Sequence, residues 1–227
     1  MPTKDFSFAH HAERFNDHIS ASIPGYLELA DLCVRLAGRF IQEDSSVIDL
    51  GCTTGRLLAA VHERYSGRRK DVSYVGLDVE AQFRRQWATY VSHDLRFEVR
   101  DARQFKPDRP ISLAMSIFTL QFLKPSDKMP LLQRLYDSML PGGALLIAEK
   151  TLASSSMLQD ALTFPYYDTK LRNGFSSKQV LDKERSLRGQ MTLWERGKLE
   201  DNLRRVGFAE VECVFGHFPF FCYVAVK

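Results

Sequence analysis

The feature that most constrains the fold is a β-branched apolar run that ends directly in a glycine-rich turn. The run spans residues 46–50, and the turn over 51–55 reads Gly-Cys-Thr-Thr-Gly. The next stretch places Leu57, Leu58 and Val61 at helical spacing. A strand, a glycine loop and a helix in this order are typical of a parallel α/β sheet. We therefore expect the chain to fold around such a sheet.

The rest of the chain continues the alternation of strands and helices. A closing helix over 193–205 precedes two strands whose short connection predicts an antiparallel hairpin. The predicted fold class is α/β, a Rossmann-like and mostly parallel seven-stranded sheet with an antiparallel C-terminal hairpin. The other predicted strands are 72–78, 96–99, 111–117, 144–148, 210–215 and 220–226, and the other helices are 26–40, 80–90 and 128–139.

The domain organisation is simple. No repeat and no Pro/Gly/Ser-rich linker divides the 227 residues, and 44% hydrophobic with 26% charged residues is an ordinary globular composition. We expect one domain over 1–227. Its N-terminal arm, 1–25, is expected to pack back on the body, and a mostly helical insertion over 151–192 interrupts the strand–helix rhythm.

Composition narrows the function classes. The net charge of +3 is close to neutral, so direct nucleic-acid binding is not expected. The four cysteines form no CxxC pair, which predicts no metal site and a reducing compartment. The chain shows neither a signal peptide nor an apolar run of membrane-spanning length, so we expect no membrane association and a cytoplasmic location.

The glycine loop is the first candidate ligand site, because ligands of parallel α/β sheets bind beyond the carboxyl ends of the strands. The loop lacks the G-x-G-x-x-G pattern of dinucleotide sites and the GK[ST] of phosphate loops. Its pattern, with Asp49, Gly51 and Gly55, suits S-adenosylmethionine, which carries no phosphate. The alternative is a tight strand-to-helix turn without a ligand.

Two acidic residues follow the next strands. Asp78 ends the second strand, where a carboxylate can accept both ribose hydroxyls; the alternative is a helix N-cap. Asp101 ends the third, where it meets the adenine edge or serves only as a turn carboxylate. No G-x-S-x-G elbow supports hydrolase chemistry. Alkyl transfer remains consistent, because a sulfonium is already activated and positioning supplies most of the rate.

The loop, both acidic residues and the terminal hairpin together resemble class I S-adenosylmethionine-dependent methyltransferases over 46–227. Segments 22–26, 118–123, 141–150 and 173–186 resemble more narrowly the carboxy-S-adenosylmethionine synthase family. The resemblance implies the class I methyltransferase fold without methylation. It implies conversion of S-adenosylmethionine and prephenate to carboxy-S-adenosylmethionine and phenylpyruvate. The product of the family feeds a downstream enzyme that modifies the wobble uridine of tRNA.

The resemblance also assigns roles to residues. Tyr26 falls on a cofactor-contacting tyrosine and Asp78 on the ribose aspartate. Val79 and Ile117 depart from the family, which has asparagine at both positions; isoleucine cannot hydrogen-bond, so a cofactor contact at Ile117 is lost or supplied by the backbone. The predicted cofactor-binding residues are Tyr26, Asp49, Gly51, Cys52, Thr53, Gly55, Asp78, Val79, Asp101, Ala102, Ile117 and Arg185.

Arg185 falls on the arginine that holds the added carboxylate in the family, and it is the predicted catalytic residue. The physics is consistent, because a buried carboxylate needs a partner and a guanidinium offers a two-pronged, permanently charged one. The alternative is a surface ion pair on a charged helix that also carries Lys183, Glu184 and Arg188.

Prephenate is a dianion, so further cations are expected near Arg185, and Lys150 and Arg172 are the candidates. The Arg185 segment engages a second subunit in the family, which implies a homodimer. No metal is expected. Two alternatives stay open: an ordinary S-adenosylmethionine-dependent methyltransferase, and an inactive cofactor-binding scaffold. A methyltransferase has no need for a carboxylate clamp, and the intact loop with Asp78 argues against a scaffold.

Overall fold

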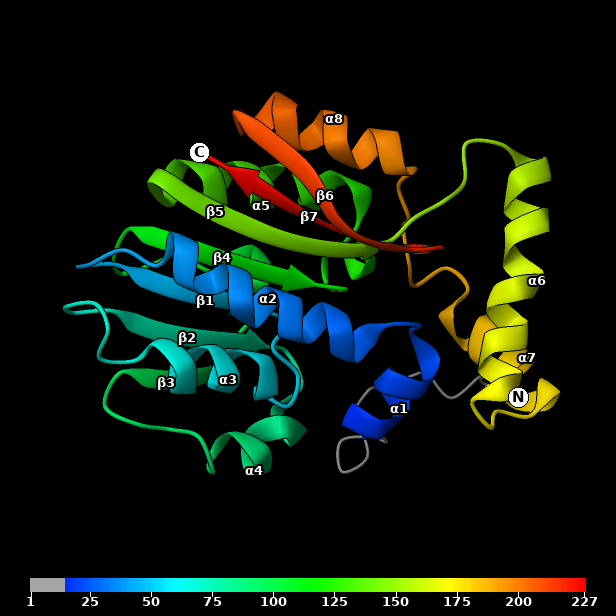
Figure 1. Cartoon of the computed structure of the whole chain (residues 1–227), viewed down its shortest axis with the longest axis horizontal. Helices are drawn as coiled ribbons and strands as arrows, with labels where there is room; N and C mark the ends of the chain where they lie inside the picture. Colours follow the sequence, from blue (N-terminus) through cyan, green and yellow to red (C-terminus); the bar gives the residue numbers. More distant parts are fainter. Residues whose placement is uncertain (1–14) are drawn as a thin grey trace.

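The computed structural model describes residues 15–227, which form a central seven-stranded sheet in the order β3-β2-β1-β4-β5-β7-β6 (Figure 1). The first five strands are parallel, and β7 runs antiparallel to both β5 and β6. The predicted fold class is confirmed. The strands are β1 (Ser46–Leu50), β2 (Ser73–Asp78), β3 (Leu95–Val99), β4 (Ile111–Ile117), β5 (Met139–Lys150), β6 (Glu210–His217) and β7 (Phe220–Val226).

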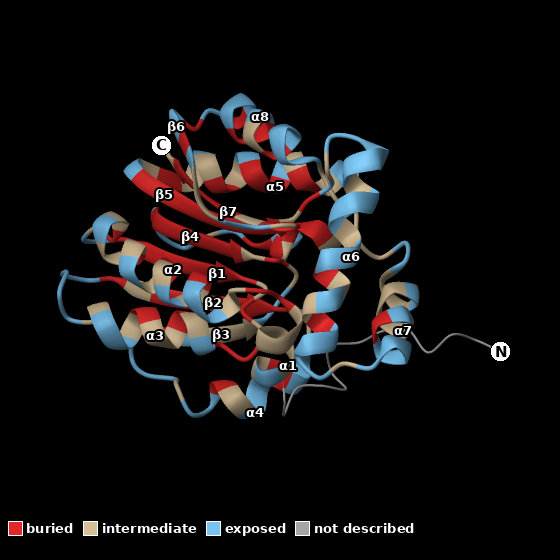
Figure 2. Cartoon of the chain, turned by 45° about the vertical axis from the view of Figure 1, so that its right-hand side comes forward, coloured by how far each residue is buried: buried red, intermediate tan, exposed pale blue. Residues whose placement is uncertain are grey.

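Helices cover both faces of the sheet. One face packs on α2 (Tyr26–Phe40) and α3 (Arg56–Tyr65), and the other on α5 (Pro125–Ser138) and α8 (Arg196–Val206). Side chains alternate along a strand, so neighbouring residues of β1 pack into different cores. Val47 packs on the side of α2 and α3, and Ile48 packs on the side of α5 and α8. Figure 2 shows the strands buried between these two helical layers.

Three helices lie beyond the carboxyl ends of the parallel strands, where they face the glycine loop (Figure 1). They are α1 (Phe15–Ser22), α6 (Ser156–Arg172) and α7 (Ser177–Leu187). Ser176 begins α7 with a reciprocal capping box, which fixes where this helix starts. Residues 1–14 of the predicted N-terminal arm lie outside the described part of the chain. Within 15–227, no helix combines the length and the apolar character needed to cross a membrane.

Two predicted elements have different bounds in the structure. The helix expected over 80–90 is only a 3₁₀ turn, Ala81–Phe83, followed by α4 (Arg84–Trp87). At the end of α4 the Trp87 indole donates to the Thr53 carbonyl at 2.7 Å, which ties this short helix to the glycine loop. Strand β5 begins at Met139 rather than at 144, because residues 140–143 form a bulge opposite β4.

Candidate active site

A cavity of about 520 Å³ opens at the carboxyl ends of β1, β2 and β4. This is the edge at which parallel α/β sheets bind ligands, and the volume is in the usual range for small-molecule sites. Helices α1, α6 and α7 supply the opposite wall. The predicted cofactor residues that line the cavity are Gly51, Thr53, Asp78, Val79, Asp101, Ala102 and Ile117.

Asp78 ties the ends of β1 and β2 together. Its Oδ2 accepts the backbone N–H of Thr53 at 2.9 Å, and its Oδ1 accepts that of Glu80 at 2.9 Å. Burial raises the pKa of Asp78 above its ordinary value, and the two N–H groups oppose this. A carboxylate has about four acceptor positions, so roughly two remain for the hydroxyls of a ribose. The carboxylate fits the role predicted for it.

Gly51 has no room for a side chain. Its φ is +70°, and a Cβ would lie 2.2 Å from Thr119 Oγ1, which donates to the Leu50 carbonyl at 2.8 Å. This close approach lets backbone, rather than side chains, form the wall of the cavity.

We expect Gly51→Ala to lower the free energy of unfolding by about 2 kcal/mol, through backbone strain and displacement of Thr119. Gly67 provides a matched control, because its φ is +74° and a Cβ there meets nothing within 4 Å. Gly67→Ala should cost only about 1 kcal/mol. Urea denaturation of both variants measures the difference. Equal losses would show that the contact with Thr119 is unimportant.

Four of the predicted residues on or near the loop do not line the cavity: Tyr26, Asp49, Cys52 and Gly55. Asp49 is 2% exposed, and burial together with the charge of Asp78 raises its pKa to about 8. Asp49 is therefore mostly protonated at neutral pH. Burial, reinforced by Asp49, raises the pKa of Tyr26 to about 12, so it stays a neutral phenol.

The two departures from the family pattern both lie on the cavity wall. Val79 is 63% exposed and follows Asp78 at the ribose side. Ile117 precedes Phe118, whose φ is +59° and whose ring lies 6.4 Å from that of Tyr26. Neither aliphatic side chain can hydrogen-bond. Polar contacts at these two points must come from the backbone.

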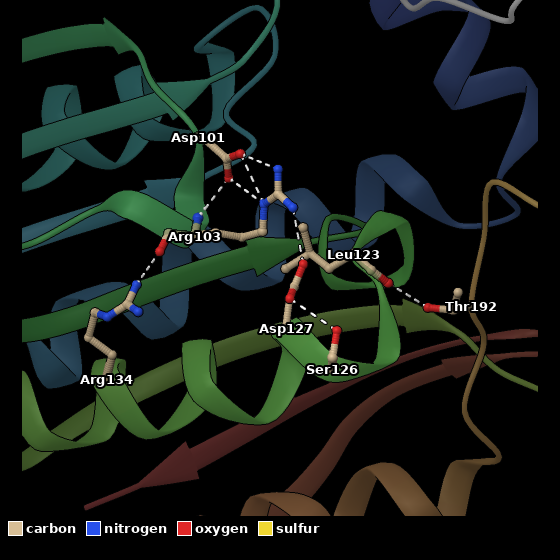
Figure 3. A network of polar contacts seen from close by, with 7 residues as sticks. All are labelled: Asp101, Arg103, Leu123, Ser126, Asp127, Arg134 and Thr192. Carbon is tan, nitrogen blue, oxygen red and sulfur yellow. Dashed lines mark hydrogen bonds and ion pairs between the residues drawn. The ribbon is translucent and has the colours of Figure 1, made fainter.

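At the predicted adenine side, Asp101 is engaged by an arginine that the sequence analysis did not single out (Figure 3). Arg103 Nη2 lies 2.6 Å from Asp101 Oδ2, and its Nη1 lies 3.1 Å from Asp127 Oδ2. The hydrogen bonds from Arg103 lower the pKa of Asp101. Asp101 also caps the short turn that follows it, so both of its predicted roles are compatible with the geometry. A signal for this pair was present in the sequence, because Arg103 follows Asp101 by two residues.

The end of the cavity nearest the insertion is cationic. Lys150 from β5, Lys170 from α6 and Lys183 from α7 all line it. Only Lys150 was among the predicted cations. Arg172 and Arg185 do not line the cavity. The Arg185 side chain is 73% exposed, and its Nη1 lies 3.5 Å from Asp182 Oδ1 on the surface of α7.

Segment 118–123 connects the cavity to the end of the insertion. The side chain of Gln121 accepts the backbone N–H of Lys150 at 2.9 Å, and its carbonyl accepts that of Thr192 at 2.8 Å. The Thr192 hydroxyl donates to the Leu123 carbonyl at 2.6 Å (Figure 3). These hydrogen bonds therefore join segment 118–123 to the end of the insertion.

No group of three or more His, Cys, Asp or Glu suited to a metal ion occurs within 15–227.

Comparison with known proteins identifies close relatives in sequence. The family described as a methyltransferase domain matches residues 47–143. The carboxy-S-adenosyl-L-methionine synthase of Desulfotalea psychrophila is 30% identical over 232 residues, covering 100% of this chain and 94% of the relative. The carboxy-S-adenosyl-L-methionine synthase of Actinobacillus succinogenes is 32% identical over 229 residues, covering 98% of this chain and 94% of that relative.

Solved structures agree on the fold. A putative O-methyltransferase from Nostoc punctiforme matches with a TM-score of 0.64 and 12% identity, covering 97% of this chain and 60% of the other. Human N-acetylserotonin methyltransferase in complex with S-adenosylmethionine matches with a TM-score of 0.61 and 15% identity, covering 96% and 55%. At these identities the likeness concerns the fold alone.

Proposed function

The chain belongs to the carboxy-S-adenosyl-L-methionine synthase family, and from this premise we propose that it converts S-adenosylmethionine and prephenate to carboxy-S-adenosylmethionine and phenylpyruvate. One observation carries the proposal. A single cavity joins a loop suited to S-adenosylmethionine at one end to a lysine cluster at the other. Such a cavity can place a sulfonium cofactor beside an anionic carboxyl donor. A methyltransferase needs no such cationic end.

The protein residues act mainly by positioning. Asp78 would accept the ribose hydroxyls, Asp101 and Ala102 would border the adenine, and the backbone at Gly51 would leave room for the methionine part; all four residues line the cavity. The bound cofactor would supply an activated sulfonium methyl: this carbon gives up a proton and gains the carboxyl group that prephenate loses, and the proton leaves with the hydroxyl group of prephenate as water. Apolar side chains that line the cavity, such as Phe118, exclude water from the reacting carbon.

Mass spectrometry of the small molecule released by denaturing the purified protein tests the proposal, together with prephenate turnover. A ligand heavier than S-adenosylmethionine by one CO₂, and formation of phenylpyruvate, are the expected results. Plain S-adenosylmethionine with no prephenate turnover would favour a methyltransferase. Absence of any cofactor binding would favour neither enzyme.

Arg185 is proposed to hold the added carboxylate within a homodimer. The exposure of Arg185 supports contact with a second copy of the chain, because its side chain extends from the surface of its own subunit into solvent. An apolar stripe on the neighbouring α6 supports the same interface: Met157, Phe164 and Leu171, at seven-residue intervals, are 74%, 69% and 41% exposed. The product would then serve a downstream enzyme that transfers the carboxymethyl group, to a tRNA wobble uridine or a similar acceptor.

We expect Arg185→Ala to reduce the preference for carboxy-S-adenosylmethionine over S-adenosylmethionine by roughly 30-fold, the value of a charge-assisted hydrogen bond. Calorimetric dissociation constants for both ligands measure the ratio. Arg188→Ala is the control, since this exposed arginine follows on the same helix end. The assignment of Arg185 fails where both variants change the ratio equally.

A further inference from the structure

The side-chain amide of Gln121 binds the protein through its oxygen only. Gln121 lies in the 3₁₀ turn Leu120–Phe122 and lines the cavity, although only 5% of the residue is exposed. Its Oε1 accepts the backbone N–H of Lys150 at 2.9 Å. A backbone N–H can only donate, so this contact fixes which end of the amide is the oxygen. The nitrogen, with two N–H donors, is the other end.

The described residues offer no hydrogen-bond acceptor to Gln121 Nε2. Gln159 on α6 provides the contrast. Its Oε1 also accepts a backbone N–H, from Ala153 at 2.9 Å, but its Nε2 donates to Thr163 Oγ1 at 3.2 Å. A buried amide nitrogen without an acceptor loses the free energy of its hydrogen bonds. Because Gln121 lines the cavity, a ligand in the cavity can supply that acceptor.

The strand order places this amide away from the ribose end of the cofactor. Asp78 ends β2, whereas the Gln121 amide is bonded to the end of β5. In the sheet, β5 lies three strand positions from β2, roughly 14 Å at the usual strand spacing. The Gln121 amide is therefore too far from a ribose held by Asp78. It faces the part of the cavity that the proposed function assigns to the carboxyl donor.

Lys150 brings a positive charge to the same part of the cavity. Its side chain is 15% exposed and lines the cavity, and its Nζ lies 3.9 Å from Glu184 Oε1. At this distance the two groups attract each other without a hydrogen bond. An ammonium group attracts an anion from many directions, whereas a planar amide directs its N–H groups. The amide of Gln121 and the ammonium of Lys150 together suit one carboxylate of a ligand.

We propose that Gln121 Nε2 binds the carboxylate of prephenate that phenylpyruvate retains, beside the Lys150 ammonium. The inference rests on the proposed function and adds a residue that orients the carboxyl donor. The reaction removes the other carboxylate of prephenate from the ring. Hydrogen bonds to that group would stabilise its charge before transfer and so slow the reaction. A fixed N–H donor is useful at the carboxylate that stays, because the other carboxylate is then free to face the sulfonium methyl.

The test compares prephenate with its product. Each is titrated by calorimetry into protein loaded with S-adenosylhomocysteine, which has no methyl group to carboxylate. We expect Gln121→Glu to weaken the binding of prephenate and of phenylpyruvate about 100-fold, because it replaces N–H donors with a charge that repels carboxylates. Gln121→Met should weaken both about tenfold. Gln159→Glu is the matched control: it makes the same change at a glutamine that does not line the cavity, and it should bind both compounds like the wild type.

The order of the two Gln121 variants separates ligand binding from a structural role. Glutamate keeps an oxygen for the Lys150 N–H, and methionine does not. A merely structural role would make Gln121→Met the weaker binder of prephenate, and this order would overturn the proposal. The affinity for S-adenosylhomocysteine should stay within about twofold in all variants, which also shows that they are folded. An equal loss of S-adenosylhomocysteine binding would assign the amide to the cofactor and overturn the proposal as well.

Two further results would decide against the assignment. Unchanged prephenate affinity in Gln121→Glu would mean that the amide does not bind this ligand. A loss for prephenate but not for phenylpyruvate would mean that the amide binds the carboxylate that leaves. Failure of the proposed function has a different outcome: prephenate then binds in a manner that depends on Gln121, but the wild-type protein forms no carboxy-S-adenosylmethionine. The two failures are therefore distinguishable.

Discussion

Asp78→Asn is expected to weaken S-adenosylmethionine binding about 100-fold while the sheet stays folded. The amide keeps the size of the carboxylate but offers one acceptor oxygen in place of two. Thr53 and Glu80 already donate to the two carboxylate oxygens. In the variant these N–H groups and the ribose hydroxyls compete for one oxygen, and the amide N–H₂ faces donors.

Isothermal titration calorimetry with S-adenosylmethionine measures this loss. Asp71→Asn is the matched control, because Asp71 lies just before the opposite end of β2 and pairs with Arg109 on the surface. Its affinity for the cofactor should equal that of the wild type. A loss of less than about threefold for Asp78→Asn would mean that the ribose is held elsewhere. Urea denaturation checks that neither change unfolds the protein.

The fold and the cofactor end of the site follow from local patterns. The apolar run of β1 predicts a strand buried on both faces, and all five of its residues are buried. The loop after β1 and Asp78 at the end of β2 meet because the carboxyl ends of neighbouring parallel strands lie at one edge. These relations depend on residues close in sequence or on strand order, so the sequence is sufficient to predict them.

The cationic end could not be predicted in the same way, because it depends on how α6 and α7 fold over that edge. A lysine on a polar helix has the pattern of a solvated face, and Lys170 and Lys183 are no exception in sequence. Helix geometry separates Lys183 from Arg185: two residues correspond to about 200° of rotation, whereas Lys183 and Leu187 share a face. Lys183 and Leu187 both line the cavity, and Arg185 does not.

Two buried groups of opposite charge type, Lys128 and Glu149, interact electrostatically between α5 and β5. Lys128 on α5 is 1% exposed; its Nζ donates to the Thr192 carbonyl and lies 4.7 Å from the centre of the Trp194 ring. Glu149 at the end of β5 is 5% exposed. Burial raises the pKa of Glu149 to about 8, and the charge of Lys128 opposes that rise. Burial lowers the pKa of Lys128, and the charge of Glu149 opposes that shift.

Lys128→Met should lower the free energy of unfolding by about 3 kcal/mol, since it removes the positive charge that acts on Glu149 and a hydrogen-bond donor to Thr192. Glu149 must then hold a proton in the folded state that the unfolded state releases above its ordinary pKa. Stability of the variant should therefore fall more steeply than that of the wild type as the pH rises from about 6 to 9. Urea denaturation at both pH values measures this.

The double variant Lys128→Met/Glu149→Gln separates the electrostatic interaction of the two groups from the other contacts of Lys128. Replacing both charges leaves no uncompensated carboxylate, so it should recover about half of the lost stability and remove the added pH dependence. Additive losses in the double variant would show that Lys128 acts through Thr192 and Trp194 rather than through Glu149. Because Thr192 also binds segment 118–123, the single variant should loosen the cavity wall as well. Stability is then expected to recover in part in the double variant, while cofactor affinity stays reduced because the contact with Thr192 is still missing.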